Sequence, residues 1–490
     1  MRNKTPFLTG FSARLCGGAK ASAQARIAAG YRRTAAKTIA DSARMFAPVL
    51  DPGFMRGLAG GRDRSFGEVT TFWAWTGQIL GGNSSCAQAV GQVQAWCAES
   101  GRAVPSSNTA AYCAARSRLP QSFLDGVHER VAGPMAARRR DEDLWHGMAL
   151  KAIDGSSVRL ADTPDNQRDY PQPSGQKPGC GFPVMGFVGV VDLSSGAWLG
   201  AADGTCNTHD SSLAGQVLHH FGEGDLALAD RAFNSYEIVA LLLGRGTHSL
   251  MRLHQNRHRK LDWRSGKKLG PCERLVEWKK PARMPRGTRM DAAAWEALPE
   301  SLSLRYIRFR YENRAGERCE MVLVTTLTDA KAHDWMEVAE LYAVRWEIEV
   351  KLRDLKTTLG MESFAVLSPA MARKTLAMMM IAHNLVRSMM QRAAICGPCP
   401  LRTISFKGSL DLLAVWRPRH RGRNHHVRIM AGLDAELLDL MATKKIVPRP
   451  FRREPRAVKL RPKSYARLGV PRRQCVEIQH RSQYRKAPLS

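Results

Sequence analysis

The chain has 490 residues, which is enough for two to four domains and at least one large hydrophobic core. Its 74 lysines and arginines against 44 aspartates and glutamates give a formal net charge of +30, and a positive surplus of this size attracts polyanions, most commonly nucleic acid. No apolar run approaches the ~20 residues that a bilayer span needs, which excludes an integral helical membrane protein. The eleven cysteines show no disulfide framework, a usage typical of reduced thiols in a cytosol.

The amino-terminal part of the chain divides into a basic arm and a helical segment. Residues 1–64 are basic and glycine-bearing with little periodicity, so we expect a loosely ordered arm or short helices. Residues 65–143 have helical periodicity, with helices predicted at 86–97 and 108–118. This pair, with Arg116 and Arg118 on its second helix, resembles a DNA-binding helix-turn-helix, but such pairs are also common in plain helical bundles. Both interpretations stay open at this point.

From Trp145 the pattern changes to short strands and helices. The first strand-like run ends in Asp154, followed by a glycine that allows a tight turn beside the carboxylate. A later, fully apolar run is typical of a central strand buried on both faces, and it ends in a second aspartate, Asp230. The predicted elements are strands 148–154, 182–192 and 197–202, helix 210–221, strand 226–230, helix 235–243 and strand 248–253.

Further along, a basic segment with alternating strand-like runs interrupts this order, and we expect it to be a mostly β insertion. The end of the chain alternates proline with arginine and lysine, a composition that cannot bury a core and predicts a flexible tail. The predicted units after residue 143 are a first core segment at 144–253, the insertion at 254–327, a second core segment at 328–400, a helical region at 401–443 and the basic tail at 444–490.

Residues 333–360 have the pattern of one amphipathic helix of six or seven turns. Asp334 and Glu337 form a capping-box pattern at its start, and Gly360 is suited to end it. At about 100° per residue, apolar residues repeated every three or four positions make one stripe that faces a core. The stripe consists of Val338, Leu341, Val344, Ile348, Leu352, Leu355 and Leu359.

A row of polar side chains follows one edge of this stripe. Tyr342, Arg345, Glu349 and Lys356 are spaced by three, four and seven residues, so they lie within roughly 60° of one another. At the border of a core, the carboxylate can hold a divalent metal while the other three groups bind phosphates. The alternative is a solvated helix flank with i,i+4 charge pairs.

This spaced row resembles the Y-R-E-K motif of the insertion-sequence transposases of the IS4 group, which are DDE enzymes. Such a motif requires two upstream aspartates, and Asp154 and Asp230 stand at the matching places. The resemblance covers about residues 148–400. It implies an α/β fold with an RNase H-like mixed sheet and helices on both faces, interrupted by a mostly β insertion. An N-terminal helical domain and a basic C-terminal tail complete the expected architecture.

The resemblance also implies a divalent-metal site, since three converging carboxylates repel one another unless cations lie among them. Two Mg²⁺ or Mn²⁺ ions are expected, as in other two-metal phosphoryl-transfer sites. In relatives, a Trp or Met ahead of an apolar strand end fills the gap left by a flipped-out base; Met321 is at the matching place, although a methionine in a strand is usually core. The implied catalytic and metal-binding residues are Asp154, Asp230 and Glu349, and the implied phosphate-binding residues are Tyr342, Arg345 and Lys356.

The expected function is therefore cut-and-paste DNA transposition. The expected partner is double-stranded DNA, both terminal inverted repeats and target, bound by a homodimer in a synaptic complex at the nucleoid of a bacterial cytoplasm. One alternative is another RNase H-like nuclease, which the β insertion and the phosphate-binding row disfavour. A second is a catalytically silent, transposase-derived DNA-binding protein, which the intact carboxylates disfavour.

Overall fold

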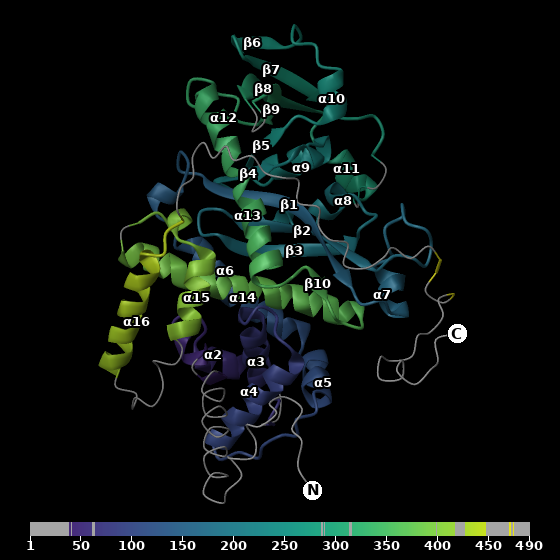
Figure 1. Ribbon diagram of the computed structural model, residues 1–490. Helices are drawn as coiled ribbons and strands as arrows, with labels where there is room; N and C mark the ends of the chain where they lie inside the picture. The colour runs from purple at the N-terminus through teal and green to yellow at the C-terminus, as the bar shows by residue number, and fades with distance from the viewer. Residues whose placement is uncertain are drawn as a thin grey trace, which may run out of the picture.

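The computed structural model describes residues 39–40, 42–60, 64–285, 288, 290–312, 316–397, 399–416, 427–446, 470–471 and 474. These residues form a large mixed sheet with helices packed on its faces and a group of N-terminal helices at one end (Figure 1). The predicted mixed α/β class is confirmed. Most of the predicted arm at 1–64 and of the predicted tail at 444–490 lies outside the described residues.

A ten-stranded sheet with β1 near its middle organises the fold. On one side, β1, β2 and β3 are antiparallel neighbours; on the other, β1, β4 and β5 are parallel neighbours. The strand order is β3-β2-β1-β4-β5-β9-β8-β7-β6, and β10 pairs with the end of β1. The strands are β1 (Ala149–Leu160), β2 (Val184–Asp192), β3 (Ala197–Thr205), β4 (Asp225–Ala229), β5 (His248–Arg252), β6 (Lys267–Gly270), β7 (Glu273–Lys279), β8 (Ser301–Glu312), β9 (Arg318–Thr325) and β10 (Ser363–Phe364).

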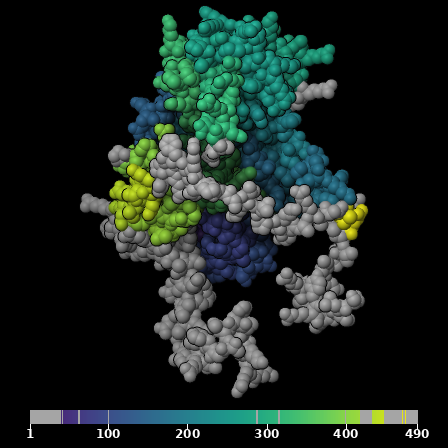
Figure 2. Space-filling model, turned by 45° about the horizontal axis from the view of Figure 1, so that its top comes forward, coloured from purple at the N-terminus to yellow at the C-terminus, as the bar shows by residue number. Residues whose placement is uncertain are grey.

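The β-rich segment predicted at 254–327 belongs to this same sheet. Its last strand, β9, pairs antiparallel with β5 from Leu250↔Thr325 to Arg252↔Leu323. Strands β8, β7 and β6 then continue outward as an antiparallel meander. In the space-filling view, this teal region and the N-terminal helices occupy opposite ends of the molecule (Figure 2). The backbone hydrogen bonds between β5 and β9 therefore join the insertion directly to the central strands.

The N-terminal helices have an aromatic core. Phe46 stacks on Trp73, and Phe72 contacts both Trp73 and Phe123 edge-on. Arg116 is buried and lies 4.1 Å from the ring centroid of Trp75, so this side chain packs in the helical core and does not present itself to DNA. The helices are α2 (Pro52–Leu58), α3 (Glu68–Leu80), α4 (Cys86–Glu99), α5 (Ala110–Arg118) and α6 (Gln121–Ala137).

Helices cover both faces of the sheet, and each face has its own hydrophobic core. The larger core gathers the N-terminal helices, α12, α13 and the long α14, while the smaller one lies under α8 and α9. Among the described helices, none has the length and apolarity to cross a bilayer. The remaining helices are α7 (Pro164–Asp169), α8 (Asp210–Ala214), α9 (Tyr236–Leu243), α10 (Gln255–Arg259), α11 (Ala292–Glu296), α12 (Trp335–Val344), α13 (Glu347–Arg353), α14 (Pro369–Cys396), α15 (Phe406–Trp416) and α16 (Val427–Ala442).

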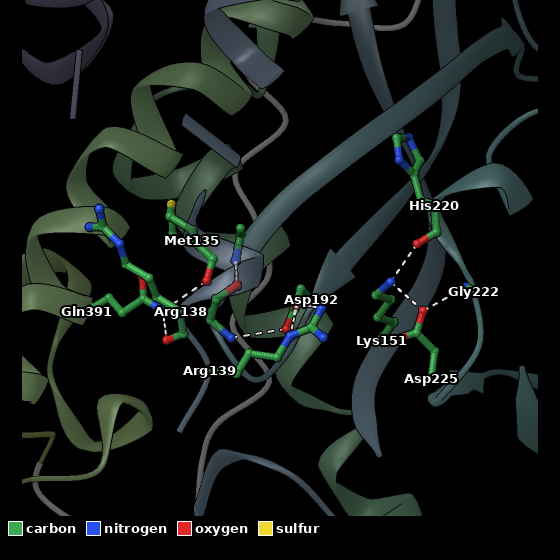
Figure 3. A network of polar contacts seen from close by, with 11 residues as sticks. Met135, Arg138, Arg139, Lys151, Asp192, His220, Gly222, Asp225 and Gln391 are labelled. Carbon is green, nitrogen blue, oxygen red and sulfur yellow. Dashed lines mark hydrogen bonds and ion pairs between the residues drawn. The ribbon is translucent and has the colours of Figure 1, made fainter. Parts of the chain in front are cut away.

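Buried polar contacts fasten the helices to the end of the sheet where β1 begins (Figure 3). Arg139, just after α6, donates two hydrogen bonds to the fully buried Asp192 at the end of β2, at 3.0 and 2.7 Å. Gln391 of α14 donates to the carbonyls of Met135 and Arg138, both at 3.0 Å. These contacts tie α6, α14 and β2 together.

Candidate active site

The register of the sheet brings Asp154 and Asp230 side by side. In the parallel pair of β1 and β4, Ile153 lies opposite Ala229, and the two aspartates come next on each chain. Side chains alternate across a strand. Because Ala152 and Leu228 point into the larger core, Asp154 and Asp230 project from that same face, which α12 and α13 cover.

Strand β1 does not end at Asp154, contrary to the sequence prediction. It continues to Leu160, because Gly155 to Arg159 keep pairing with β2 and the last residues pair with β10. The glycine also has a different role from the predicted turn. A Cβ atom at Gly155 would lie 2.2 Å from a carboxylate oxygen of Asp210, so the glycine allows Asp210 to pack against the strand. Strand β4, in contrast, ends at Ala229, directly before Asp230.

The predicted single helix over 333–360 is divided into α12, α13 and a π-helical turn at Asp354–Thr358. Between α12 and α13 the backbone tightens, and Arg345 and Trp346 donate to carbonyls three residues back. The Asp334 side chain caps α12 as predicted, at 2.8 Å from the Met336 amide. Glu337, however, contacts His146 and does not complete a capping box. Apolar periodicity cannot reveal a tight turn that keeps the same face buried.

Arg345 lies between two of the three predicted catalytic carboxylates. Its guanidinium is 3.1 Å from Glu349 Oε1 and 4.0 Å from Asp154 Oδ2, and its side chain is only 12% exposed. A partly buried guanidinium in this place offsets the repulsion between carboxylates that converge from different elements. The structure thus brings Asp154, Asp230, Arg345 and Glu349 into one electrostatically connected group.

The pKa of Asp154 is raised to about 6, chiefly by burial and to a smaller extent by the charges of Glu349 and Asp230. The amide of Gly155, which donates to Asp154 Oδ1 at 2.8 Å, and the charge of Arg345 act in the opposite direction. A buried carboxyl with like charges nearby ionises less readily. Asp154 is therefore a side chain whose charged form needs a cation beside it.

The other predicted site residues occupy different surroundings. Tyr342 is buried, its hydroxyl donates to the carbonyl of Ala229 at 3.3 Å, and burial raises its pKa to about 12, so the phenol stays neutral. Lys356 lies on the π-helical turn, where burial lowers its pKa and Glu362 raises it. Met321 is partly buried opposite Phe309 and packs against the larger core.

Sequence reasoning missed one cation of this group. Arg252 ends β5 and, by alternation from Leu250, projects from the same face as Asp154 and Asp230. Burial raises the pKa of Tyr342, and the charge of Arg252 offsets part of this rise, which places Arg252 close to the row. The alternation of side chains along the predicted strand 248–253 could have identified Arg252 as a member of this group.

A family model described as "Transposase DDE domain" matches residues 145–385, which include all three carboxylates. The transposase InsG of insertion sequence element IS4 from Escherichia coli K12 is 29% identical over 331 residues, covering 66% of this chain and 70% of that protein. The chain belongs to the IS4-type DDE transposases.

Two further comparisons are more distant. The putative transposase InsZ from the same bacterium is 28% identical over 133 residues, covering 27% of this chain and 44% of that protein. A cryo-EM structure of the piggyBac transposase synaptic complex with hairpin DNA covers 80% of this chain and 84% of that one, at 9% identity and a TM-score of 0.41. That TM-score is too low to establish a shared fold.

The carboxylates of this transposase fit the donor chemistry of Mg²⁺ or Mn²⁺, which prefer oxygen ligands. In the described part of the chain, no three His, Cys, Asp or Glu side chains are close enough to one another to hold an ion as they stand. Arg345 engages Asp154 and Glu349, so both carboxylates would have to turn from the guanidinium to become ligands. These carboxylates are therefore side chains of the type that binds Mg²⁺ or Mn²⁺. In this structure, Arg345 neutralises two of them, Asp154 and Glu349.

The raised pKa of Asp154 predicts that this site destabilises the metal-free protein at neutral pH. The folded chain binds the proton more tightly than the unfolded chain, whose carboxyl has the ordinary pKa of 3.8. Stability should therefore fall as pH rises from about 4 to about 6, by about 2–3 kcal/mol. In EDTA, Asp154→Asn should be more stable than wild type at pH 8, and the two should agree near pH 3.5.

Urea unfolding at several pH values tests this expectation. Asp165→Asn, at an exposed position on α7, is the matched control and should follow wild type throughout. An Asp154→Asn advantage that did not change with pH would contradict the assigned titration.

Proposed function

We propose that this DNA transposase cuts its element ends by metal-dependent phosphoryl transfer and joins the freed 3′ ends to target DNA. The observation that carries the proposal is the register that puts Asp154 and Asp230 on one face of the sheet, under the helix carrying Glu349. The order of the first five strands, β3-β2-β1-β4-β5, supports an RNase H-like core. Carboxylates that lie side by side on adjacent central strands are what such chemistry requires.

Asp154, Asp230 and Glu349 are the residues that would hold Mg²⁺ or Mn²⁺ ions. When bound, such ions supply activation of the attacking oxygen and stabilisation of the leaving oxygen in an in-line displacement. In the first step, a water oxygen bonds to the phosphorus and the P–O3′ bond breaks, leaving a 3′-hydroxyl and a 5′-phosphate. That hydroxyl oxygen then bonds to a phosphorus of the opposite strand, whose P–O3′ bond breaks, so that a hairpin forms and the flanking DNA leaves with a 3′-hydroxyl. Water breaks the hairpin phosphodiester and restores the 3′-hydroxyl of the element end. This hydroxyl finally bonds to a phosphorus of target DNA and displaces a 3′-oxygen there.

Arg345, Tyr342 and Lys356 are proposed to bind DNA phosphates beside the carboxylates. In the DNA-free protein, Arg345 neutralises Asp154 and Glu349, and bound cations would release its guanidinium for a phosphate. Met321 is proposed to fill the base stack vacated at a hairpin. A homodimer holding two ends is the proposed assembly, because joining both ends requires two active sites at one target.

Incubating the purified protein with labelled end DNA and Mg²⁺ tests the function. Nicks, hairpins and joined strands that depend on Mg²⁺ and are lost in Asp230→Asn would support it. Specific end binding without any cleavage would favour the catalytically silent DNA-binding protein, and nicking of any duplex without joining would favour a plain nuclease.

Arg345→Ala and Lys356→Ala should slow hairpin formation and strand joining by about 10–100-fold. They should slow the first nick by less than about fivefold, because phosphate contacts matter most when the cut end is repositioned. Time courses on sequencing gels separate the steps. Lys407→Ala, at an exposed position on α15, should leave every step unchanged. An equal loss at each step would count against phosphate binding by these side chains.

A further inference from the structure

A buried charged pair lies between the β insertion and the helices that carry the active-site row. Arg305 of β8 is 0% exposed, and its Nε donates to Glu273 Oε2 of β7 at 2.6 Å. Its Nη2 forms an ion pair with the same carboxylate. Ile307, two residues further along β8, points into the larger core, so Arg305 projects from the face of the sheet on which α12 packs.

The third nitrogen of this guanidinium binds the connection between β9 and α12. Nη1 of Arg305 donates to the carbonyl of His333 at 2.8 Å and lies 3.5 Å from the carbonyl of Leu327. His333 directly precedes Asp334, whose side chain caps α12. One side chain therefore holds both ends of the connection and joins them, through Glu273, to strand β7.

A second contact holds the same connection from the side of β1. The ring of His333 stacks on Trp145, with 5.3 Å between the ring centroids. Trp145 lies in a tight turn just before β1, in which it exchanges two backbone hydrogen bonds of 2.9 Å with Met148. The start of α12 is therefore fixed against both the insertion and the strand that carries Asp154.

Stability alone does not explain why an arginine occupies this place. Removing a charged pair from water is costly, and apolar residues of similar volume often replace such pairs with no loss of stability. The neighbouring side chains on this face, Ile307 and Leu323, are already apolar. An apolar residue would supply no donor to the two carbonyls, whereas a hydrogen bond is directional. Arg305 therefore specifies where the connection lies, which apolar packing alone would not do.

The connection is the base from which the active-site row extends. Residues 334–353, which form α12 and α13, contain no glycine or proline, so a displacement at their start is passed along the helices. At 1.5 Å per residue, α12 is about 15 Å long, and a tilt of about 5° moves its far end by about 1 Å. A misplacement of about 1 Å can slow an enzyme roughly 10²-fold.

We propose that Arg305 is a positioning residue for Glu349. By binding both ends of the connection between β9 and α12, it sets where the helices present this carboxylate to the two aspartates of the sheet. The inference rests on the proposed metal-dependent cleavage, which it deepens. Arg305 is fully buried, so it contacts no DNA. Its loss should therefore alter metal dependence while sparing the binding of DNA ends.

Arg305→Met and Glu273→Gln separate positioning from stability. Both variants break the buried charged pair, so both should lower the urea midpoint of unfolding. Only Arg305→Met also removes the donor to the two carbonyls. With labelled end DNA, its nicking rate should fall at least about tenfold and its half-maximal Mg²⁺ concentration should rise severalfold. In Glu273→Gln both quantities should stay near wild type, and end binding in gel shifts should be retained in both variants.

Arg308→Met is the matched control on the same strand. Arg308 also pairs with a carboxylate, Glu320 at 3.9 Å, but its side chain is 38% exposed. It projects from the opposite face of β8, away from α12, so this variant should nick like wild type. Arg305→Lys keeps the charge and one donor group, and should recover part of the loss.

Hydrogen exchange provides a readout independent of cleavage. Arg305→Met should exchange faster within residues 327–349, whereas Glu273→Gln should exchange like wild type there. If the wild-type chain fails to nick DNA, the proposed function fails, and the exchange data still decide the positioning role. Equal Mg²⁺ requirements in the two variants, or unchanged exchange of 327–349 in Arg305→Met, overturns the inference.

A double variant keeps the test decisive if Arg305→Met does not fold. Arg305→Met combined with Glu273→Met removes both buried charges, so the protein should fold. It still lacks the donor to the carbonyls and should nick slowly. A folded double variant that nicks at the wild-type rate would show that the pair serves only stability, and the inference would fall.

Discussion

Replacing Asp154 or Asp230 by asparagine, or Glu349 by glutamine, should reduce DNA strand cleavage by at least about 10³-fold, roughly 4 kcal/mol of transition-state stabilisation. Each change keeps the size of the side chain and removes one negative charge from the group around Arg345. The charge left on Arg345 attracts phosphate, so binding of end DNA should be retained or slightly strengthened. Cleavage gels and gel shifts on the same preparations measure both quantities.

The matched control for this prediction is Asp411→Asn, which removes a carboxylate from the exposed face of α15 and should cleave like wild type. Substantial Mg²⁺-dependent nicking by any one of the three site variants would remove that residue from the catalytic group. Loss of end binding together with cleavage would indicate misfolding, and a thermal melt distinguishes this case.

Lys151→Met should lower the free energy of unfolding by about 3–5 kcal/mol. Lys151 lies on β1 and donates to the carbonyl of His220 at 2.7 Å and to Asp225 of β4, with side-chain exposures of 10% for the lysine and 6% for the aspartate (Figure 3). Removing the cation leaves the Asp225 carboxylate buried, with only the Gly222 amide as a donor in this network. Urea unfolding monitored by tryptophan fluorescence measures the loss.

Two variants show whether the cost comes from an unpaired buried charge. Lys151→Met combined with Asp225→Asn should recover a large part of the lost stability. Lys407→Met breaks an i,i+4 pair whose side chains are 65% and 60% exposed, and should cost at most about 1 kcal/mol. Equal effects at the buried and exposed pairs would refute the argument from burial.

The fold was largely predictable where hydrophobic periodicity is strong. The strand before Asp230 followed from a fully apolar run, the strand before Asp154 from a strand-like run, and the helical character of 333–360 from a period of about 3.6. The end of β1 was missed, because Gly155 and the residues after it stay paired with β2 and β10, which are distant in the sequence. The division of the Glu349 helix was also missed, since a locally tightened turn leaves the apolar stripe intact.

The site was predictable to the extent that residue type and spacing matched a known family. The contact of Arg345 with Asp154 depends on elements far apart in the chain, and so does the position of Arg252, whereas the contact of Arg345 with Glu349 is the i,i+4 pair that the spacing allowed. The sequence left open whether the arginines of the second N-terminal helix contact DNA, and the structure shows that one of them, Arg116, packs against Trp75.

The pairing of β5 with β9 has a practical consequence for dissecting this enzyme. Excising residues 254–327 would remove β9, which pairs with the backbone N–H and C=O groups of β5. One edge of β5 would then be left unpaired in the middle of the protein. Unpaired borders of this kind recruit strands from other molecules. A shortened catalytic fragment made by such a deletion should aggregate, whereas a truncation that stops outside β9 would keep the border covered.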